Sequence, residues 1–297
     1  MGRIGKANFI YNVVDGWGKL PYGHEFGQVA GVATDSEGMV HLFNRSNHPI
    51  QIFDPDGNFV RAWGEGLFIS PHGITIGSDN SYWLADKDAH VVQKYNAHGQ
   101  LLMTLGNRNQ PSDTGYNPKD RVVKESGDPF NLPTKIALGP DGEIYVSDGY
   151  GNSRIHKFSP EGELILSWGS PGDKPGDFNL PHSLWVDRFR RVLVCDRENH
   201  RIQIFDSGGK YITTWPGFKQ PTDIYIDSDD IVYVSELGDR VSILDIDGNV
   251  LSRWGDERSH ESGKFWGAHG IWVCAKGDIY VSEVLDGQRV QKFVRNR

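Results

Sequence analysis

The sequence predicts an all-β fold, a six-bladed β-propeller of four-stranded sheets that occupies residues 1–297 as a single domain. Three observations support this prediction. Short apolar alternations recur along the chain between glycine-containing turns, and long helical periodicity is absent. Residues 130–169 and 178–215 align with each other strand for strand. The last copy of the repeat lacks its fourth strand, and a matching segment stands near the N-terminus.

Each copy of the repeat has a lead-in segment followed by four expected strands, with a turn or short loop between consecutive strands. The intervals between equivalent positions, just before the first strand, are 42, 62, 48, 40 and 47 residues. A four-stranded repeat of about 40–50 residues is typical of a propeller blade. The positions themselves are Ala30, His72, Thr134, His182, Thr222 and His269.

The two ends of the chain are expected to share one blade. Residues 265–293 supply three strands, and residues 11–18 (YNVVDGWG) match the Trp-Gly ending of the fourth strands at Trp63, Trp168 and Trp254. An N-terminal strand paired into the last blade would close the ring and protect its sheet edges. We expect the repeated indoles to fill space between neighbouring blades.

The longest interval contains a polar insertion at residues 107–129, rich in glycine, proline and charged residues. A loop of this kind is either a lid over a site or a disordered excursion, and the sequence leaves both interpretations open.

Composition excludes several classes of function. With Lys+Arg 31 and Asp+Glu 39, the formal charge of −8 argues against a nucleic-acid partner or an anionic membrane surface. The sequence has no apolar run of about 18 residues and no secretory signal pattern, so we expect a cytoplasmic location, with secretion as the alternative. The two cysteines, Cys195 and Cys274, are expected to be free thiols that pack inside strands.

Three of the 11 histidines share one repeat position and alternate around the expected ring. His72, His182 and His269 belong to the second, fourth and sixth blades, whereas Ala30, Thr134 and Thr222 occupy this position in the others. The first strand of a blade lies nearest the central channel, so the three imidazoles should converge there. Three histidines with an open position form the arrangement of a catalytic zinc site.

A second set of equivalent positions follows the second strand of each blade. Polar and acidic residues there are expected to accept backbone N–H bonds: Asn44, Asp86, Asp148, Asp196, Glu236 and Glu283. Arg45 and Arg197 stand one residue later, and Tyr150 stands two residues later. We expect these three side chains at the same mouth, where arginine can bind a carboxylate and tyrosine can act as a base. A surface ion pair for each arginine and a packed rim tyrosine are the structural alternatives.

These segments resemble the NHL repeat and, more narrowly, the peptidyl-α-hydroxyglycine α-amidating lyase family. The resemblance spans nearly the whole chain and is carried by GQVAGVATD, FNRSNH, SPHGITI, SDGYGNSRIHKFSPEG, LPHSL, QPTDI, DRENHRIQIF and AHGI. It implies zinc on His72, His182 and His269, a catalytic Tyr150, and active-site arginines at Arg45 and Arg197. The implied reaction cleaves a hemiaminal, of small-molecule or peptide origin and bearing a carboxylate, to an amide and glyoxylate.

Three positions depart from the family pattern. Gly267 replaces a methionine, Gly270 replaces an aspartate associated with a structural calcium, and Gly151 replaces a disulfide-bonded cysteine of the animal lyases. The resemblance therefore predicts zinc, whereas these departures argue against the structural calcium. Two other functions remain open: a non-catalytic propeller that serves as a protein-interaction scaffold, and a metal-dependent hydrolase similar to lactonases. Lactonase-type sites favour calcium with oxygen ligands, whereas imidazoles suit zinc.

Overall fold

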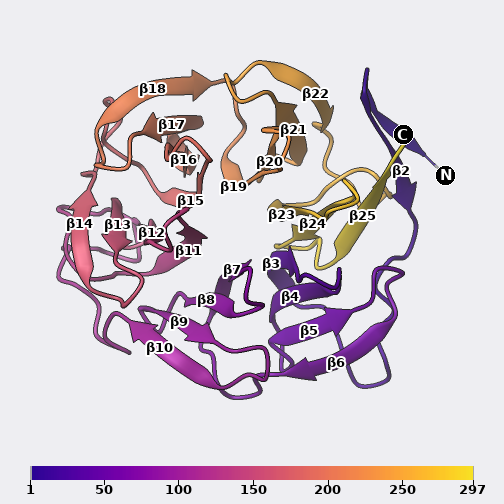
Figure 1. Cartoon of the computed structure of the whole chain (residues 1–297), viewed down its shortest axis with the longest axis horizontal. Helices are drawn as coiled ribbons and strands as arrows, with labels where there is room; N and C mark the ends of the chain where they lie inside the picture. Colours follow the sequence, from indigo (N-terminus) through magenta and orange to yellow (C-terminus); the bar gives the residue numbers. More distant parts are fainter. Residues whose placement is uncertain (1, 297) are drawn as a thin grey trace. The chain divides into compact units, whose positions relative to one another are not determined.

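A computed structural model describes residues 2–296 and contains six antiparallel sheets (Figure 1). Five sheets have four strands and one has five, so the fold is the six-bladed β-propeller that the sequence predicts. Within residues 2–296 the helical content is one short 3-10 helix, η1 (Arg197–Asn199). The chain divides into two compact units, the second formed by Phe68–Pro221 and the first by the residues before and after it. Whether all six blades behave as one domain stays a prediction.

The second unit contains three blades, and in each the strands follow one another across the sheet in chain order. The first blade consists of β7 (Pro71–Ile76), β8 (Tyr82–Asp86), β9 (Val91–Tyr95) and β10 (Leu101–Leu105). The next consists of β11 (Pro133–Leu138), β12 (Ile144–Asp148), β13 (Arg154–Phe158) and β14 (Leu164–Trp168). The third consists of β15 (Pro181–Val186), β16 (Val192–Asp196), β17 (Arg201–Phe205) and β18 (Tyr211–Pro216).

The first unit contains the other three blades. One consists of β3 (Gln28–Thr34), β4 (Val40–Arg45), β5 (Ile50–Phe53) and β6 (Phe59–Trp63). Another consists of β19 (Pro221–Ile226), β20 (Val232–Glu236), β21 (Arg240–Leu244) and β22 (Val250–Gly255). The last combines β23 (Ala268–Val273), β24 (Ile279–Glu283) and β25 (Val290–Arg295) with two N-terminal strands, β1 (Arg3–Lys6) and β2 (Phe9–Val14).

The N-terminal strand closes the last blade as predicted. In Figure 1, β2 lies beside β25, and the register pairs Tyr11 with Arg295 and Val14 with Lys292. The strand covers Phe9–Val14 rather than the predicted residues 11–18. It ends early because Gly16 and Gly18, which follow it, take positive φ angles of 63° and 89°. The additional outer strand β1 was not predicted.

Aromatic side chains on the fourth strands pack against the next blade. Within the second unit, Trp168 of β14 lies 5.9 Å from Phe205 of β17, between ring centroids. Within the first unit, Trp254 of β22 lies 5.9 Å from Tyr11 and 5.7 Å from Phe293 by the same measure. Both indoles therefore bridge neighbouring blades, as the repeated Trp-Gly pairs predict.

Candidate metal centre

The repeat position occupied by histidine or threonine lies in a β-bulge near the start of the first strand. The pairing register shifts between Pro71 and Ile74, between Pro133 and Lys135, and between Pro181 and Ser183. In the first unit it shifts between Val29 and Gly31 and between Ala268 and Gly270. A bulged residue is left out of the ladder, and its side chain is turned away from the normal alternation. The bulge is the local reason why His72, His182 and His269 point out of their sheets.

Backbone carbonyls select the ring nitrogen that each of two histidines can offer to a metal. His72 Nδ1 lies 2.8 Å from the Thr134 carbonyl oxygen, and His269 Nδ1 lies 2.7 Å from the Ala30 carbonyl oxygen. A carbonyl only accepts, so each Nδ1 carries the hydrogen and each Nε2 keeps its lone pair. Histidines that bind metals are typically held in this way.

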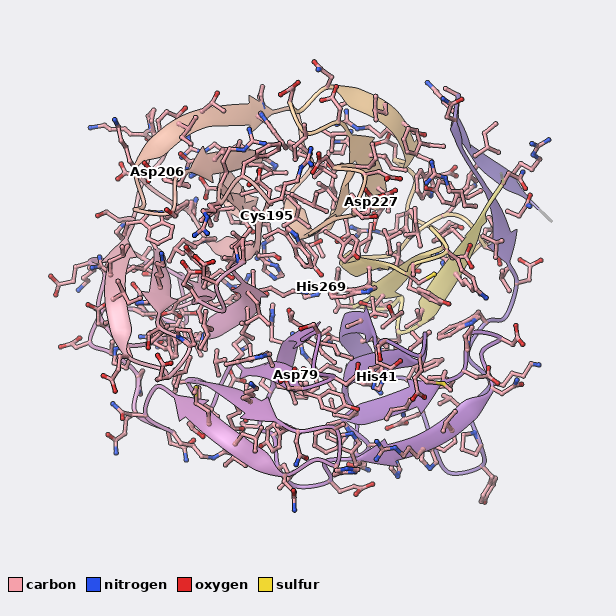
Figure 2. All side chains as sticks on the ribbon, viewed as in Figure 1. His41, Asp79, Cys195, Asp206, Asp227 and His269 are labelled. Atoms are coloured by element: carbon pink, nitrogen blue, oxygen red, sulfur yellow. The ribbon has the colours of Figure 1, made fainter. Side chains whose placement is uncertain are left out.

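His72 and His182 approach each other inside the second unit. Their ring centroids are 4.8 Å apart, and the exposed fractions of the two residues are 1% and 2%. The Tyr150 hydroxyl lies 3.5 Å from His72 Nε2 and 3.3 Å from His182 Nε2. His269, on β23 in the first unit, is also buried (Figure 2). Each of the three histidines is buried, and each can offer one ring nitrogen to a metal ion.

Tyr150 stands in a loop that directly follows β12 and is flanked by two glycines. A Cβ atom on Gly149 would lie 2.3 Å from the Pro181 carbonyl oxygen, and one on Gly151 would lie 2.2 Å from Asn131 Oδ1. Neither position has room for a side chain, so the loop packs closely and places Tyr150 beside His182. In this structure a cysteine in place of Gly151 would collide with Asn131.

Arg197 follows β16 in η1 and points at Tyr150. Its Nη1 donates to the Tyr150 hydroxyl at 3.1 Å, its Nε donates to Glu198 Oε1 at 2.8 Å, and its guanidinium carbon lies 5.2 Å from the Tyr150 ring centroid. The residue is 5% exposed. Burial alone would lower the pKa of Arg197, but Tyr150 and Glu198 outweigh it and raise the pKa above its ordinary value. Arg197 therefore remains charged, and the surface ion pair offered as its structural alternative does not describe a buried group.

Arg45 ends β4 in the first unit. Its Nη1 donates to Gln28 Oε1 at 2.9 Å, and its side chain is half-buried. The structure therefore brings His72, His182, Tyr150 and Arg197 together within the second unit. The roles of Arg45 and His269 toward that group stay predictions.

Sequence reasoning did not select Lys87, which also contacts Tyr150. Its Nζ lies 5.4 Å from the Tyr150 ring centroid, and its ammonium pairs with Asp88. A signal was present in the repeat, because Lys87 follows β8 at the position that Arg197 takes after β16. Because that position was interpreted as an arginine site, Lys87 was not selected.

The acidic positions at the ends of the second strands behave largely as predicted. The carboxylates of Asp86, Asp148, Asp196 and Glu283 accept backbone N–H bonds from Ser70, Asn131, Asn179 and Trp266, respectively, each at 2.8 Å. The donors belong to the lead-in segment of the same blade rather than to the loop that follows the acid. Glu236 differs, since it accepts from the Arg240 guanidinium at 3.0 Å.

The insertion at residues 107–129 is folded against the loop that carries Tyr150. Thr114 is 1% exposed and donates its hydroxyl to the Gly151 carbonyl oxygen at 2.6 Å. Asn131 Nδ2 donates to Thr114 Oγ1 at 3.1 Å, and Gly151 N donates to the Asn131 carbonyl oxygen at 3.0 Å. The disordered alternative therefore does not describe this segment, and a role as a lid stays a prediction.

No helix within residues 2–296 is both long enough and apolar enough to cross a lipid bilayer.

Comparison with known proteins finds relatives that are named as amidating enzymes and others that are named as NHL repeat-containing proteins. The NHL repeat profile matches residues 130–158 and 178–205. Peptidylglycine alpha-amidating monooxygenase from Rattus norvegicus is 35% identical over 218 residues, covering 62% of this chain and 21% of its own. A probable peptidyl-alpha-hydroxyglycine alpha-amidating lyase from Caenorhabditis elegans is 33% identical over 211 residues, covering 62% of this chain and 57% of its own. Peptidyl-alpha-hydroxyglycine alpha-amidating lyase 1 from Drosophila melanogaster is 28% identical over 351 residues, covering 98% of this chain and 61% of its own.

The chain thus contains NHL repeats and has homologues named as amidating lyases. It spans about a fifth of the rat protein and about three fifths of the two invertebrate proteins.

Proposed function

We propose that this protein is a zinc-dependent lyase that cleaves the C–N bond of an α-hydroxyglycine-type hemiaminal to give an amide and glyoxylate. One observation carries the proposal: the Tyr150 hydroxyl lies between His72 Nε2 and His182 Nε2 and accepts a hydrogen bond from Arg197. A packed rim tyrosine would not need two imidazole nitrogens and a buried cation around its hydroxyl.

The donor set fits zinc. In His72 and His269 a backbone carbonyl holds the hydrogen on Nδ1, so Nε2 is the ring nitrogen without a hydrogen, and neutral imidazole nitrogen is a preferred zinc ligand. We propose His72, His182 and His269 as the three protein ligands. Zinc bound in this way supplies Lewis-acid catalysis by lowering the pKa of a bound hydroxyl.

The side chains of this protein provide the proton transfers and the orientation. Tyr150, as phenolate, takes the proton from the substrate hydroxyl, and Arg197 stabilises that phenolate from 3.1 Å. The carbinol C–O bond becomes the C=O bond of glyoxylate. The C–N bond breaks with its electron pair on nitrogen, and the amide nitrogen takes up the proton that Tyr150 received. We propose that Arg45 and the remaining N–H groups of Arg197 hold the substrate carboxylate.

Calcium does not form part of this proposal. A carboxylate ligand would need a side chain at residue 270, and a Cβ on Gly270 would lie 2.6 Å from Ser282 Oγ and 3.0 Å from Gly31 Cα. The backbone of β3 and the side chain from β24 occupy that space. The chain therefore lacks both the ligand and the room for it at this position.

Metal content and glyoxylate release together test the proposal. We expect the purified protein to hold about one zinc per chain and to release glyoxylate from α-hydroxyhippurate. His182→Ala should lose the metal and the activity. His200→Ala is the matched control, because His200 lies on the same blade and accepts a backbone hydrogen bond from Gln220.

Absence of transition metal after zinc addition would favour an interaction scaffold. Bound zinc without glyoxylate release, but with ester or lactone cleavage, would favour a hydrolase. A wild-type level of glyoxylate release in His182→Ala would refute the histidine site.

A further inference from the structure

We propose that Lys87 makes the protein selective for substrates that carry a second carboxylate on the acyl side of the scissile amide. The inference rests on the proposed function for the identity of the site. It concerns recognition rather than bond cleavage, so it can be tested separately from turnover.

The backbone holds Lys87 close to the histidine strand. Lys87 N donates to the Ser70 carbonyl oxygen at 3.0 Å, two residues before His72. The side chain is only 17% exposed, and its Nζ lies 5.4 Å from the Tyr150 ring centroid. Lys87 is therefore a fixed cation at the rim of the site rather than a freely moving surface lysine.

Two cations contact the Tyr150 ring, and their hydrogen bonds differ. Arg197 gives one N–H to the Tyr150 hydroxyl and another to Glu198, so part of its donor set is already used inside the site. The ammonium of Lys87 makes no hydrogen bond to Tyr150 and only approaches its ring. Attraction to the ring face is modest for a partly hydrated ammonium. The Lys87 ammonium thus places positive charge beside Tyr150 but donates none of its hydrogen bonds to it.

The carboxylates near Lys87 do not prevent it from binding a ligand. Its partner Asp88 is 46% exposed, so water screens the carboxylate of this pair and weakens its hold on Lys87. An ammonium has three N–H donors, so it can keep Asp88 and still donate to a ligand. Asp86 is fully buried, and its two oxygens accept from Ile69 N and Ser70 N. Those two hydrogen bonds direct the Asp86 carboxylate toward the lead-in segment.

The geometry defines the chemical class of the ligand. The reacting carbon must lie near the Tyr150 hydroxyl, and the Lys87 ammonium lies over the Tyr150 ring, 5.4 Å from its centroid. A carboxylate attached to the acyl group through a short chain, as in a succinyl amide, can reach from one to the other. A neutral acyl group of the same length gains nothing from Lys87.

Binding of two unreactive glycine derivatives tests this inference. N-Succinylglycine and N-succinamoylglycine lack the hydroxyl group and differ only in a carboxylate against a neutral amide. By isothermal titration calorimetry of the zinc-loaded protein, we expect the succinyl compound to bind about tenfold more tightly, as is typical for a hydrogen bond between charged groups. Lys87→Met should reduce this preference to twofold or less, and Lys87→Arg should retain most of it.

Lys94→Met is the matched control. Lys94 also lies over an aromatic ring, with its Nζ 5.2 Å from the Trp83 ring centroid on the same blade, and should leave the tenfold preference unchanged. A wild-type preference below twofold, or an unchanged preference in a folded Lys87→Met or Lys87→Gln variant, would overturn the inference. A retained binding preference without glyoxylate release from α-hydroxyhippurate would refute the proposed lyase activity but not the role of Lys87.

Discussion

The blade β11–β14 and the blade β15–β18 share one backbone plan but carry different chemistry at equivalent positions. In the bulge of the first strand, Thr134 donates its hydroxyl to the Ser147 carbonyl oxygen at 2.9 Å, whereas His182 directs Nε2 at Tyr150. After the second strand, one blade presents Tyr150 and the other presents Arg197. One blade therefore supplies the candidate base, and its neighbour supplies a metal ligand and a cation.

The third strands show a parallel contrast away from the site. Gln203 of β17 is a neutral amide that donates to the Asp196 carboxylate at 3.2 Å and to the Asp177 carbonyl oxygen at 2.7 Å. His156 of β13 takes the equivalent place and meets two carboxylates, Asp128 at 3.3 Å and Asp148 at 3.5 Å. Asp128 belongs to the insertion at residues 107–129, so the histidine ties the insertion to its blade. The two blades therefore share one backbone plan and differ in function because of single side chains.

Tyr150→Phe should produce the largest effect because it removes the proposed base from the Tyr-bearing blade. We expect kcat to fall by about 10²–10⁴-fold, the range for loss of a general base, with the zinc content unchanged. Glyoxylate release and metal analysis of the same sample provide the measurement. Tyr145→Phe, on β12 of the same blade, should keep full activity. Equal losses in both variants would indicate that the effect is structural.

Arg197→Lys should produce the next largest effect and tests the contribution of the other blade. Lysine keeps the charge but not the planar fork that donates to both Tyr150 and Glu198. We expect kcat/KM to fall by about 10–100-fold, which corresponds to the loss of one or two charge-assisted bonds. Arg191→Lys is the control, since Arg191 pairs with Asp187 at the turn between β15 and β16. Near-normal kinetics of Arg197→Lys would mean that its charge alone is sufficient.

The repeat made most of this comparison predictable, and the physical reason is that every copy follows the same order of strands and loops. The alignment identified the alternating histidines, Tyr150 and Arg197, because equivalent residues of a repeat occupy equivalent places in a blade. It did not reveal the β-bulge that turns His72 and His182 out of their sheets, since a register shift depends on pairing between strands. It also did not reveal the contact of Lys87 with Tyr150 or that of Asp128 with His156. Those contacts join different blades or an insertion, and they have no fixed spacing in the sequence.

His156→Gln converts the third-strand position of one blade to the residue found in the other. Burial alone would lower the pKa of His156, but hydrogen bonds and charge from Asp128 and Asp148 outweigh it and raise the pKa. The hydrogen bond from His156, against the opposing effect of burial, lowers the pKa of Asp128 to about 2. A raised histidine pKa stabilises the fold below about pH 6.5, and this contribution is lost as the pH rises through the folded-state value.

The carboxylate contribution has the opposite direction. A lowered Asp128 pKa stabilises the fold above about pH 4 and is lost as the pH falls toward 2. We therefore expect His156→Gln to lower the free energy of unfolding by about 2 kcal/mol at pH 5 and by less at pH 9. This value is below the usual cost of breaking a buried ion pair because Asp128 is partly exposed. Urea unfolding at both pH values gives the difference, and Gln203→Asn on the neighbouring blade should show no such pH dependence. A cost that is equal at pH 5 and pH 9 would contradict the charged pair.

Thr114→Val should produce the smallest effect and tests whether the insertion positions the Tyr150 loop. The change leaves the Gly151 carbonyl without its 2.6 Å donor and removes the acceptor of Asn131 Nδ2. We expect a loss of about 1 kcal/mol of unfolding free energy, the ordinary cost of one buried hydrogen bond. Because Gly151 adjoins Tyr150, kcat/KM should also fall by a few fold, and the zinc content should not change. Thr104→Val, on the outer strand β10, removes a hydroxyl from the same unit without touching this loop and should leave kcat/KM unaltered. If both threonine variants lost stability but neither lost activity, the insertion would stabilise the blade without positioning Tyr150.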